Sequence, residues 1–282
     1  MDYCFDTSAI NRLHDDGCRH EIVAGLLSTN HVLVSELNLV EVMTTEAIDR
    51  RRSLILLLRH LTRGVMPLLT PTALLRTLTI ARFNGISSPP ITSDGTCPEA
   101  WLALQHPEKF LDEDARQFFY KEKKNIEDRF TNVHRVARVE LSDLFPGGRP
   151  KSLGQTLRFF CKNPLSFLHT ASVLHEGITG KALDMDGMRL LFTDLPEWSL
   201  YLAVWAQGMY ARAFQNENYG STRNAGTIDL LFALYLEHCD FLVTDDREQF
   251  KALRVMNVLS RRRQPRATVL LYDQFRRRLV LN

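Results

Sequence analysis

Residues 226–250, GTIDLLFALYLEHCDFLVTDDREQF, are the stretch from which the fold can be worked out. An acid, Asp229, stands among apolar residues near the start of a helix-like run. A short strand-like run, FLV, then ends on Thr244, Asp245 and Asp246. The two runs predict a helix followed by a buried strand, with carboxylates at the ends of the most hydrophobic segment of the chain.

Strand-like and helix-like patterns alternate on both sides of this stretch. Between the strand-like runs, apolar residues recur at helical spacing, for example over residues 36–63, in two pieces, and over residues 72–83. Such alternation predicts a three-layer α/β/α fold around a mainly parallel central sheet. The expected strands are residues 3–6, 31–35, 65–69, 241–244 and 267–272.

The middle of the chain follows a different pattern. Residues 84–98, NGISSPPITSDGTCP, are dense in Gly, Pro and Ser and predict a loop. Helix-like segments without strand patterns follow as far as residue 193. We therefore expect residues 84–193 to form a mostly helical insertion in an α/β core made of residues 1–83 and 194–282.

The composition favours a folded, globular protein. The chain has 282 residues, of which 45% are hydrophobic and 24% charged. Its five cysteines are scattered without C-x-x-C spacing, and its nine histidines show no H-E-x-x-H spacing, so neither a disulfide framework nor a zinc site is expected. No secretory signal or membrane-spanning run is recognised, and a reducing cytoplasm is the expected location.

Positive charge is concentrated near the C-terminus. The formal net charge of the whole chain is only +2, but residues 247–282 carry nine Arg and one Lys against two acids. A cluster of this kind suits a phosphate-rich partner, although a solvated, solubilising face is an equally good interpretation. The cluster is centred on Arg261, Arg262 and Arg263.

Four acids occupy similar positions relative to the expected strands. Asp6 ends the first strand, Glu41 follows the second, Asp229 opens the helix before the strand FLVT, and Asp246 lies just past that strand. The carboxyl ends of parallel strands meet at one edge of a sheet, where sites form. Several carboxylates there repel one another without a cation, and Mg²⁺ or Mn²⁺ prefers such oxygen ligands. A pair of such ions is suited to phosphodiester hydrolysis.

Each acid also has a purely structural interpretation. Asp6, Asp229 and Asp246 each lie at the start of a helix, where a carboxylate caps backbone amides and complements the helix dipole. Glu41 is equally compatible with a solvated helix face. For the first helix the expected N-cap is Thr7 or Ser8.

The four motifs, taken in order, resemble those of the PIN-domain nucleases. They read CFDTSAIN around Asp6, VSELNLVEVM around Glu41, GTIDLLFALYL around Asp229 and FLVTDDREQF around Asp246. The resemblance covers residues 1–83 and 194–282, and its spacing selects Glu41 over Glu36. The insertion is a departure from compact members of the family, such as the toxins of bacterial toxin–antitoxin pairs.

The resemblance implies a metal-dependent endoribonuclease that cleaves single-stranded RNA to a 5′-phosphate and a 3′-hydroxyl. Alternatives are a structure-specific DNA nuclease and a non-catalytic RNA- or protein-binding scaffold. A homodimer and an inhibitory protein partner are further expectations from the family. The implied ligands of Mg²⁺ or Mn²⁺ are Asp6, Glu41, Asp229 and Asp246, with Asp245 through water. The implied supporting residues are Thr7, Ser8 and Thr244. The expected RNA contacts are Arg223, Asn224 and Arg261, Arg262 and Arg263.

Overall fold

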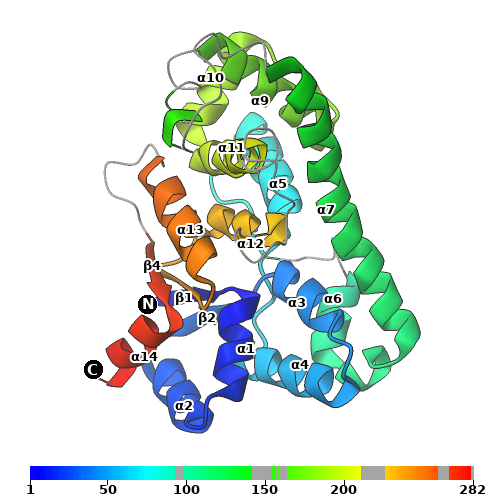
Figure 1. Ribbon diagram of the computed structural model, residues 1–282, viewed down its shortest axis with the longest axis vertical. Coiled ribbons are helices and arrows are strands. Elements are labelled where there is room, and N and C mark those ends of the chain that lie inside the picture. The colour runs from blue at the N-terminus through cyan, green and yellow to red at the C-terminus, as the bar shows by residue number, and fades with distance from the viewer. Residues whose placement is uncertain are drawn as a thin grey trace.

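Within the described part of the chain, four short strands form one parallel sheet in the lower half of Figure 1. The strand order is β2-β1-β3-β4, which confirms the expected mixed α/β class and the parallel central sheet. The strands are β1 (Asp2–Phe5), β2 (His31–Leu33), β3 (Phe241–Thr244) and β4 (Thr268–Leu271). This computed structural model describes residues 1–92, 98–141, 154–156, 158, 164–210, 226–259 and 267–280.

The strand expected at residues 65–69 does not form. Leu68 alone makes isolated bridges, a parallel one to Ser35 and an antiparallel one to Thr92. Its N–H donates to Val34 O at 2.8 Å, but the preceding residue, Pro67, has no N–H with which to extend the ladder. The prediction of a fifth strand was therefore wrong at this position.

The two central strands bury side chains on both faces of the sheet. Tyr3 and Phe5 of β1 belong to one hydrophobic cluster, here the first cluster, whereas Cys4 between them belongs to a second cluster. In β3, Val243 lies in the first cluster and Leu242 in the second. Alternation with a period of two thus places helices against each face of the sheet.

Apart from the long helix over residues 113–141, which contributes Phe119, six of the described helices contribute buried side chains to the first cluster. They are α1 (Thr7–Asp15), α2 (Arg19–Thr29), α3 (Glu36–Met43), α4 (Ile48–Thr62), α6 (Pro98–Gln105) and α14 (Tyr272–Val280). The second cluster is formed largely by another set of helices. They are α5 (Pro71–Phe83), α9 (Pro164–Thr179), α10 (Met185–Asp194), α11 (Pro196–Met209), α12 (Thr227–Leu231), the 3-10 helix η3 (Phe232–Glu237) and α13 (Arg247–Leu259).

The long helix α7 (Glu113–Leu141) runs along one side of the molecule, from its lower part to its upper part in Figure 1. A short 3-10 helix, η1 (Pro107–Phe110), precedes it. Phe119 is fully buried in the first cluster, and Ile126, two turns further on, packs against the second. Helices from the expected insertion thus share hydrophobic clusters with the rest of the chain.

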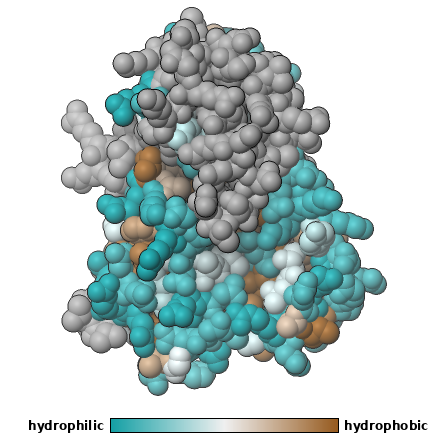
Figure 2. Space-filling view, viewed as in Figure 1, coloured by the Kyte–Doolittle hydropathy of each residue, from teal (hydrophilic) through white to brown (hydrophobic). Residues whose placement is uncertain are grey.

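Most residues coloured on the face shown in Figure 2 are hydrophilic, and the hydrophobic ones lie in small groups. Within the described ranges, no helix combines the length and apolarity needed to span a bilayer.

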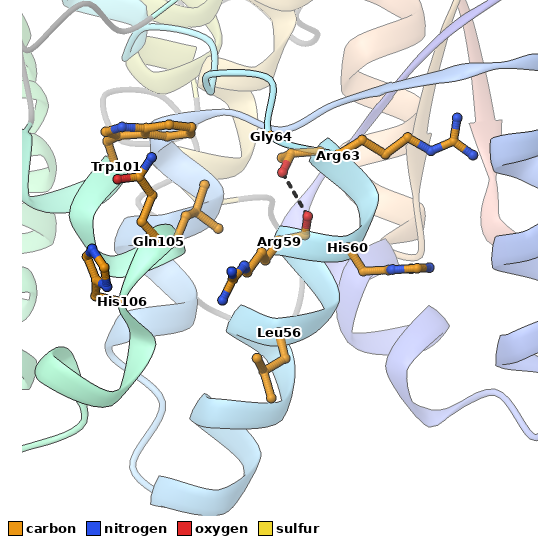
Figure 3. Close-up of a pocket in the computed structure, with 10 residues that line it drawn as sticks. Leu56, Arg59, His60, Arg63, Gly64, Trp101, Gln105 and His106 are labelled. Atoms are coloured by element: carbon orange, nitrogen blue, oxygen red, sulfur yellow. Dashed lines mark hydrogen bonds between the residues drawn. The ribbon is translucent and has the colours of Figure 1, made fainter.

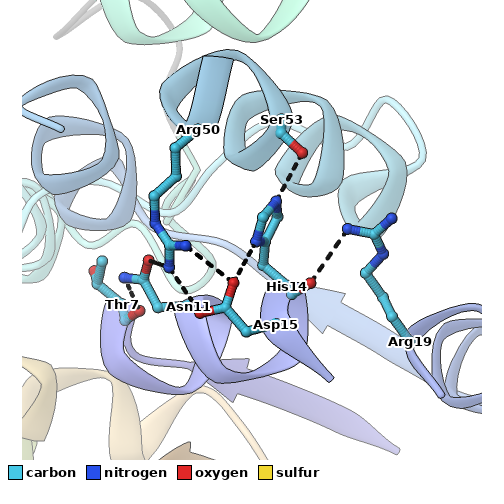
Figure 4. A network of polar contacts seen from close by, with 7 residues as sticks. All are labelled: Thr7, Asn11, His14, Asp15, Arg19, Arg50 and Ser53. Carbon is cyan, nitrogen blue, oxygen red and sulfur yellow. Dashed lines mark hydrogen bonds and ion pairs between the residues drawn. The ribbon is translucent and has the colours of Figure 1, made fainter. Parts of the chain in front are cut away.

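A network of polar side chains joins α1 to α4 (Figure 4). Arg50 donates to both carboxylate oxygens of Asp15, at 3.0 and 2.9 Å, and to Asn11 Oδ1 at 3.0 Å. The ring of His14 lies 2.8 Å from Asp15 Oδ1 through Nδ1 and 2.7 Å from Ser53 Oγ through Nε2. Hydrogen bonds from Arg50 and His14 lower the pKa of Asp15 to about 2.

We expect Arg50→Ala to lower the free energy of unfolding by about 0.5–1 kcal/mol near neutral pH, because solvent screens this partly exposed pair. The pKa of Asp15 should return toward its ordinary value, which an NMR titration of its carboxyl measures. Because the folded-state pKa is depressed, the stabilisation is present above the ordinary pKa and is lost as the pH falls toward about 2. Arg52→Ala, at an exposed arginine of the same helix, is the control. Equal urea stability of the two variants would contradict the prediction.

Candidate metal centre

Asp6 lies at the carboxyl end of β1 and caps α1. The Ala9 N–H donates to Oδ1 at 2.7 Å, and the Ser8 hydroxyl lies 2.9 and 2.8 Å from the two carboxylate oxygens. The Thr244 hydroxyl donates to Oδ2 at 2.8 Å. The N-cap expected at Thr7 or Ser8 is therefore wrong, because the carboxylate of Asp6 accepts the Ala9 N–H of the first turn.

The Asp6 carboxylate is buried and has no positively charged hydrogen-bond partner among the described residues. Its residue is only 1% exposed. Burial raises the pKa of Asp6 to about 8, and the charge of Asp229 acts in the same direction. Hydrogen bonds from Ala9, Thr244 and Ser8 act against this shift without cancelling it. A buried acid of this kind favours either a proton or a cation beside it.

Thr244, at the end of β3, links Asp6 to two other elements. Its Oγ1 lies 2.6 Å from Gln249 Oε1 and accepts the Asp246 N–H at 3.0 Å. The Nε2 of Gln249 donates to the backbone oxygen of Asp229 at 2.7 Å. The hydroxyl and the amide thus connect the ends of β1 and β3 with the starts of α12 and α13.

Of the other two hydroxyls expected to support the site, one lies at it and one does not. Ser8 contacts Asp6 and accepts the Asp245 N–H at 2.8 Å. The Oγ1 of Thr7 instead accepts a hydrogen bond from Asn38 Nδ2 at 3.3 Å. Thr7 is therefore linked to α3 and not to the Asp6 carboxylate.

The position of Glu41 follows from the way α3 begins. Ser35 caps α3, and Asn38 Nδ2 donates to Phe5 O at 3.0 Å, which fixes the helix to the end of β1. Glu41 lies on the second turn, and its side chain is 12% exposed. Glu36 instead accepts the Thr70 N–H through Oε2 at 2.9 Å, which ties it to the start of α5.

One oxygen of Glu41 is paired and the other is not. Lys123 Nζ, from α7, lies 3.2 Å from Glu41 Oε1. Glu41 Oε2 is buried and has no hydrogen-bond partner among the described residues. A buried carboxylate oxygen without a partner is costly, and a ligand or an ion bound at Glu41 Oε2 would remove that cost.

Asp229 lies on the first turn of α12, where its Oδ2 accepts the Gly226 N–H at 2.7 Å. A Cβ at Gly226 would approach that oxygen to 2.9 Å, so glycine suits this position. Burial and the charge of Glu41 raise the pKa of Asp229 to about 6, and Asp246 contributes to the increase. The Gly226 hydrogen bond and the charge of Lys123 act in the opposite direction. Asp229 thus lies within the electrostatic influence of the other site acids.

Asp246 caps α13, because its Oδ1 accepts the N–H groups of Glu248 and Gln249 at 2.7 and 2.9 Å. Asp245 is exposed at the rim. Partial burial raises the pKa of Asp245, although the charges of Arg12 and Arg247 act to lower it. The structural interpretation of Asp6 and Asp246 as caps is thus confirmed, and it is compatible with their place at the site.

Lys123 is the residue at this site that the sequence did not reveal. Burial lowers its pKa, but the charge of Glu41 and the hydrogen bond to it, with the charges of Glu127 and Asp229, raise the pKa overall. In the sequence it is one of many acids and bases that alternate along a polar helix. Only the packing of α7 against α3 and α12 brings it to the site.

The donors suit a hard cation, but they do not form a closed ligand set. Within the described residues, no three His, Cys, Asp or Glu side chains come together closely enough to hold a metal ion. Glu41 keeps its free Oε2, the Gly226 N–H bonds to one oxygen of Asp229, and the Glu248 and Gln249 N–H groups bond to one oxygen of Asp246. Carboxylate oxygens of this kind are the ligands that Mg²⁺ and Mn²⁺ prefer. Side-chain movement would be needed to gather them.

A hollow of about 850 Å³ lies between α4 and α6 (Figure 3). Among the described residues, its lining includes basic side chains such as Arg59 and His106, apolar ones such as Leu56 and Trp101, and no acid. Arg59 and Gln105 approach it from opposite helices, whereas the Arg63 side chain points away (Figure 3). This hollow is distinct from the site formed by the acids.

The residues expected to contact RNA phosphates lie outside the described part of the chain: Arg223, Asn224, Arg261, Arg262 and Arg263.

Comparison of the chain with protein-family models, with curated proteins and with solved structures finds no match. What the chain does must therefore be inferred from its own residues and their arrangement.

Proposed function

We propose that this protein is a metal-dependent endoribonuclease with a PIN-like, three-layer α/β/α core. The observation that carries the proposal is the grouping of acids at the carboxyl edge of the parallel sheet. Asp6 and Asp246 follow β1 and β3, and Asp229 and Glu41 approach from adjoining helices. The charge of Asp229 raises the pKa of Asp6, and the charges of Glu41 and Asp246 raise the pKa of Asp229. These effects support a common site, because carboxylates that repel one another are stabilised by a cation between them.

Bound Mg²⁺ or Mn²⁺ would supply an activated water and stabilise the charge on the leaving oxygen. Asp6, Glu41, Asp229 and Asp246 would hold the ions. Ser8 and Thr244 would keep the Asp6 carboxylate in one orientation through the hydrogen bonds described above.

In the proposed hydrolysis, the water oxygen bonds to phosphorus and the bond from phosphorus to O3′ breaks. One proton of the water is released and O3′ takes up a proton. The products are a 5′-phosphate and a 3′-hydroxyl.

Single-stranded RNA is the proposed substrate, on the strength of the four motifs and their order. The arginines near the C-terminus would follow the RNA backbone, which predicts binding that weakens steeply with salt. A cytoplasmic location, a homodimer and an inhibitory protein partner belong to the same proposal. A growth-arresting toxin, a defence nuclease and an RNA-processing enzyme are all roles that fit such an enzyme.

Cleavage of end-labelled single-stranded RNA by purified protein in Mn²⁺, Mg²⁺ or EDTA tests the proposal. We expect cutting in either metal and none in EDTA. Parallel reactions on single-stranded DNA and on flap DNA separate the proposed activity from that of a structure-specific DNA nuclease. A folded protein that cuts no nucleic acid in any metal would overturn the proposal and favour a non-catalytic scaffold.

A further inference from the structure

We propose that Lys123 is a built-in counter-ion of the acidic site and competes with a divalent cation for Glu41. The proposal rests on the metal centre proposed above, but it does not depend on which nucleic acid is cut. Lys123 comes from α7, within the expected insertion, so this segment of the chain would regulate how readily the site takes up metal.

The geometry supports this role for Lys123. Its ammonium lies 3.2 Å from Glu41 Oε1, in a pair whose side chains are only 29% and 12% exposed. The other oxygen, Glu41 Oε2, is buried and without a partner in the described chain. The lysine therefore contacts only one of the two Glu41 oxygens, and Oε2 is left for a divalent ion to bind.

The charges that act on Lys123 also come from the site. The charges of Glu41 and Asp229 raise the pKa of Lys123, and so does the charge of Glu127, one turn further along α7. Neither neighbouring lysine on the helix is placed in this way: Lys121 and Lys124 are exposed. The position of Lys123 among acids is thus specific to that residue.

The electrostatic consequence has a definite sign. A fixed positive charge beside a divalent cation repels it, and this repulsion is strong in a partly desolvated site. Lys123 also holds Glu41 in one orientation, which would favour metal binding. This effect rests on one hydrogen bond, and it is smaller than the repulsion between the ammonium and a divalent cation at close range. Removing the ammonium should therefore tighten metal binding.

Isothermal titration of the full-length protein with Mn²⁺, in the absence of RNA, tests the proposal. We expect Lys123→Met to bind Mn²⁺ about tenfold more tightly than the wild type, which is an ordinary size for coupling between two binding events. Lys123→Arg, which keeps the charge, should bind much as the wild type does. Lys124→Met, at an exposed position of the same helix, is the matched control and should be unchanged.

A thermal melt gives a second readout. Without metal, Lys123→Met should melt below the wild type, because the partly buried Glu41 loses its partner. Mn²⁺ should raise the melting temperature of the variant by more than it raises that of the wild type. Should Lys123→Met fail to fold, Lys123→Gln, which retains a hydrogen-bond donor, is titrated instead.

The outcomes separate this proposal from the nuclease proposal. Unchanged or weaker Mn²⁺ binding by Lys123→Met, or equal tightening in Lys123→Arg, would overturn the counter-ion role and leave the nuclease proposal intact. Tighter binding without cleavage of any nucleic acid would support the counter-ion and overturn the nuclease. No Mn²⁺ binding by the wild type or by either variant would overturn the counter-ion and the metal centre together.

Discussion

The Asp229→Asn variant is expected to lose metal-dependent RNA cleavage by about 100-fold or more, the scale seen when one charge-stabilising group is removed from an active site. The reason is electrostatic: the charges of Glu41, Asp246 and Lys123 all affect the pKa of Asp229, so its carboxylate lies among the charged groups of the site. The fold should be retained, since the amide oxygen of asparagine can still accept the Gly226 N–H. Initial rates on labelled single-stranded RNA at saturating Mn²⁺ give the measurement.

Asp6→Asn should have an effect of similar size. Asparagine is as good an N-cap as aspartate, so α1 should begin at the same place. The matched control is Asp184→Asn, because Asp184 caps α10 by accepting the Gly187 N–H at 2.7 Å and lies away from the acids. Full activity is expected of that control. Undiminished cleavage by a folded Asp6→Asn, Asp229→Asn double variant would sink the assignment of the site.

The parts of the site that lie next to strand ends could be predicted from the sequence. β1 and β3 are short, β-branched or aromatic runs, and an acid follows each of them within two residues. A parallel sheet then brings Asp6 and Asp246 to one edge, whatever lies between them in the chain. The placement of these two acids could be predicted because it needs only local patterns and one rule of topology.

Features that depend on packing between distant helices could not be predicted in this way. Lys123 reaches Glu41 only because α7 crosses α3, and nothing local distinguishes it from the exposed Lys121 and Lys124. The choice among Asp6, Thr7 and Ser8 as N-cap failed for a related reason. All three are good caps in isolation, and the hydroxyl of Ser8 is instead used by Asp6 and by the Asp245 N–H.

Stability without metal should depend on pH in a way that identifies Asp6. Its pKa is raised to about 8 in the folded protein, above the ordinary value of 3.8, so the folded state holds a proton that the unfolded state has released. The resulting stabilisation is complete below the ordinary pKa and is lost as the pH rises through about 8. In EDTA we expect the free energy of unfolding to fall by about 1 kcal/mol per pH unit across that window on account of Asp6.

Urea unfolding at pH 5, 6, 7 and 8, in EDTA, compares the wild type with Asp6→Asn. Asparagine cannot ionise, so the variant should lose less stability over this range, and the difference between the two curves isolates Asp6 from Asp229, whose pKa is also raised. Saturating Mn²⁺ should flatten the wild-type curve, because a bound cation replaces the proton beside the carboxylate. Parallel curves for the two proteins in EDTA would mean that Asp6 is already ionised in the folded state and that the protein itself stabilises its charge. The metal centre depends on a buried carboxylate whose charge is not stabilised, and that carboxylate would then be absent.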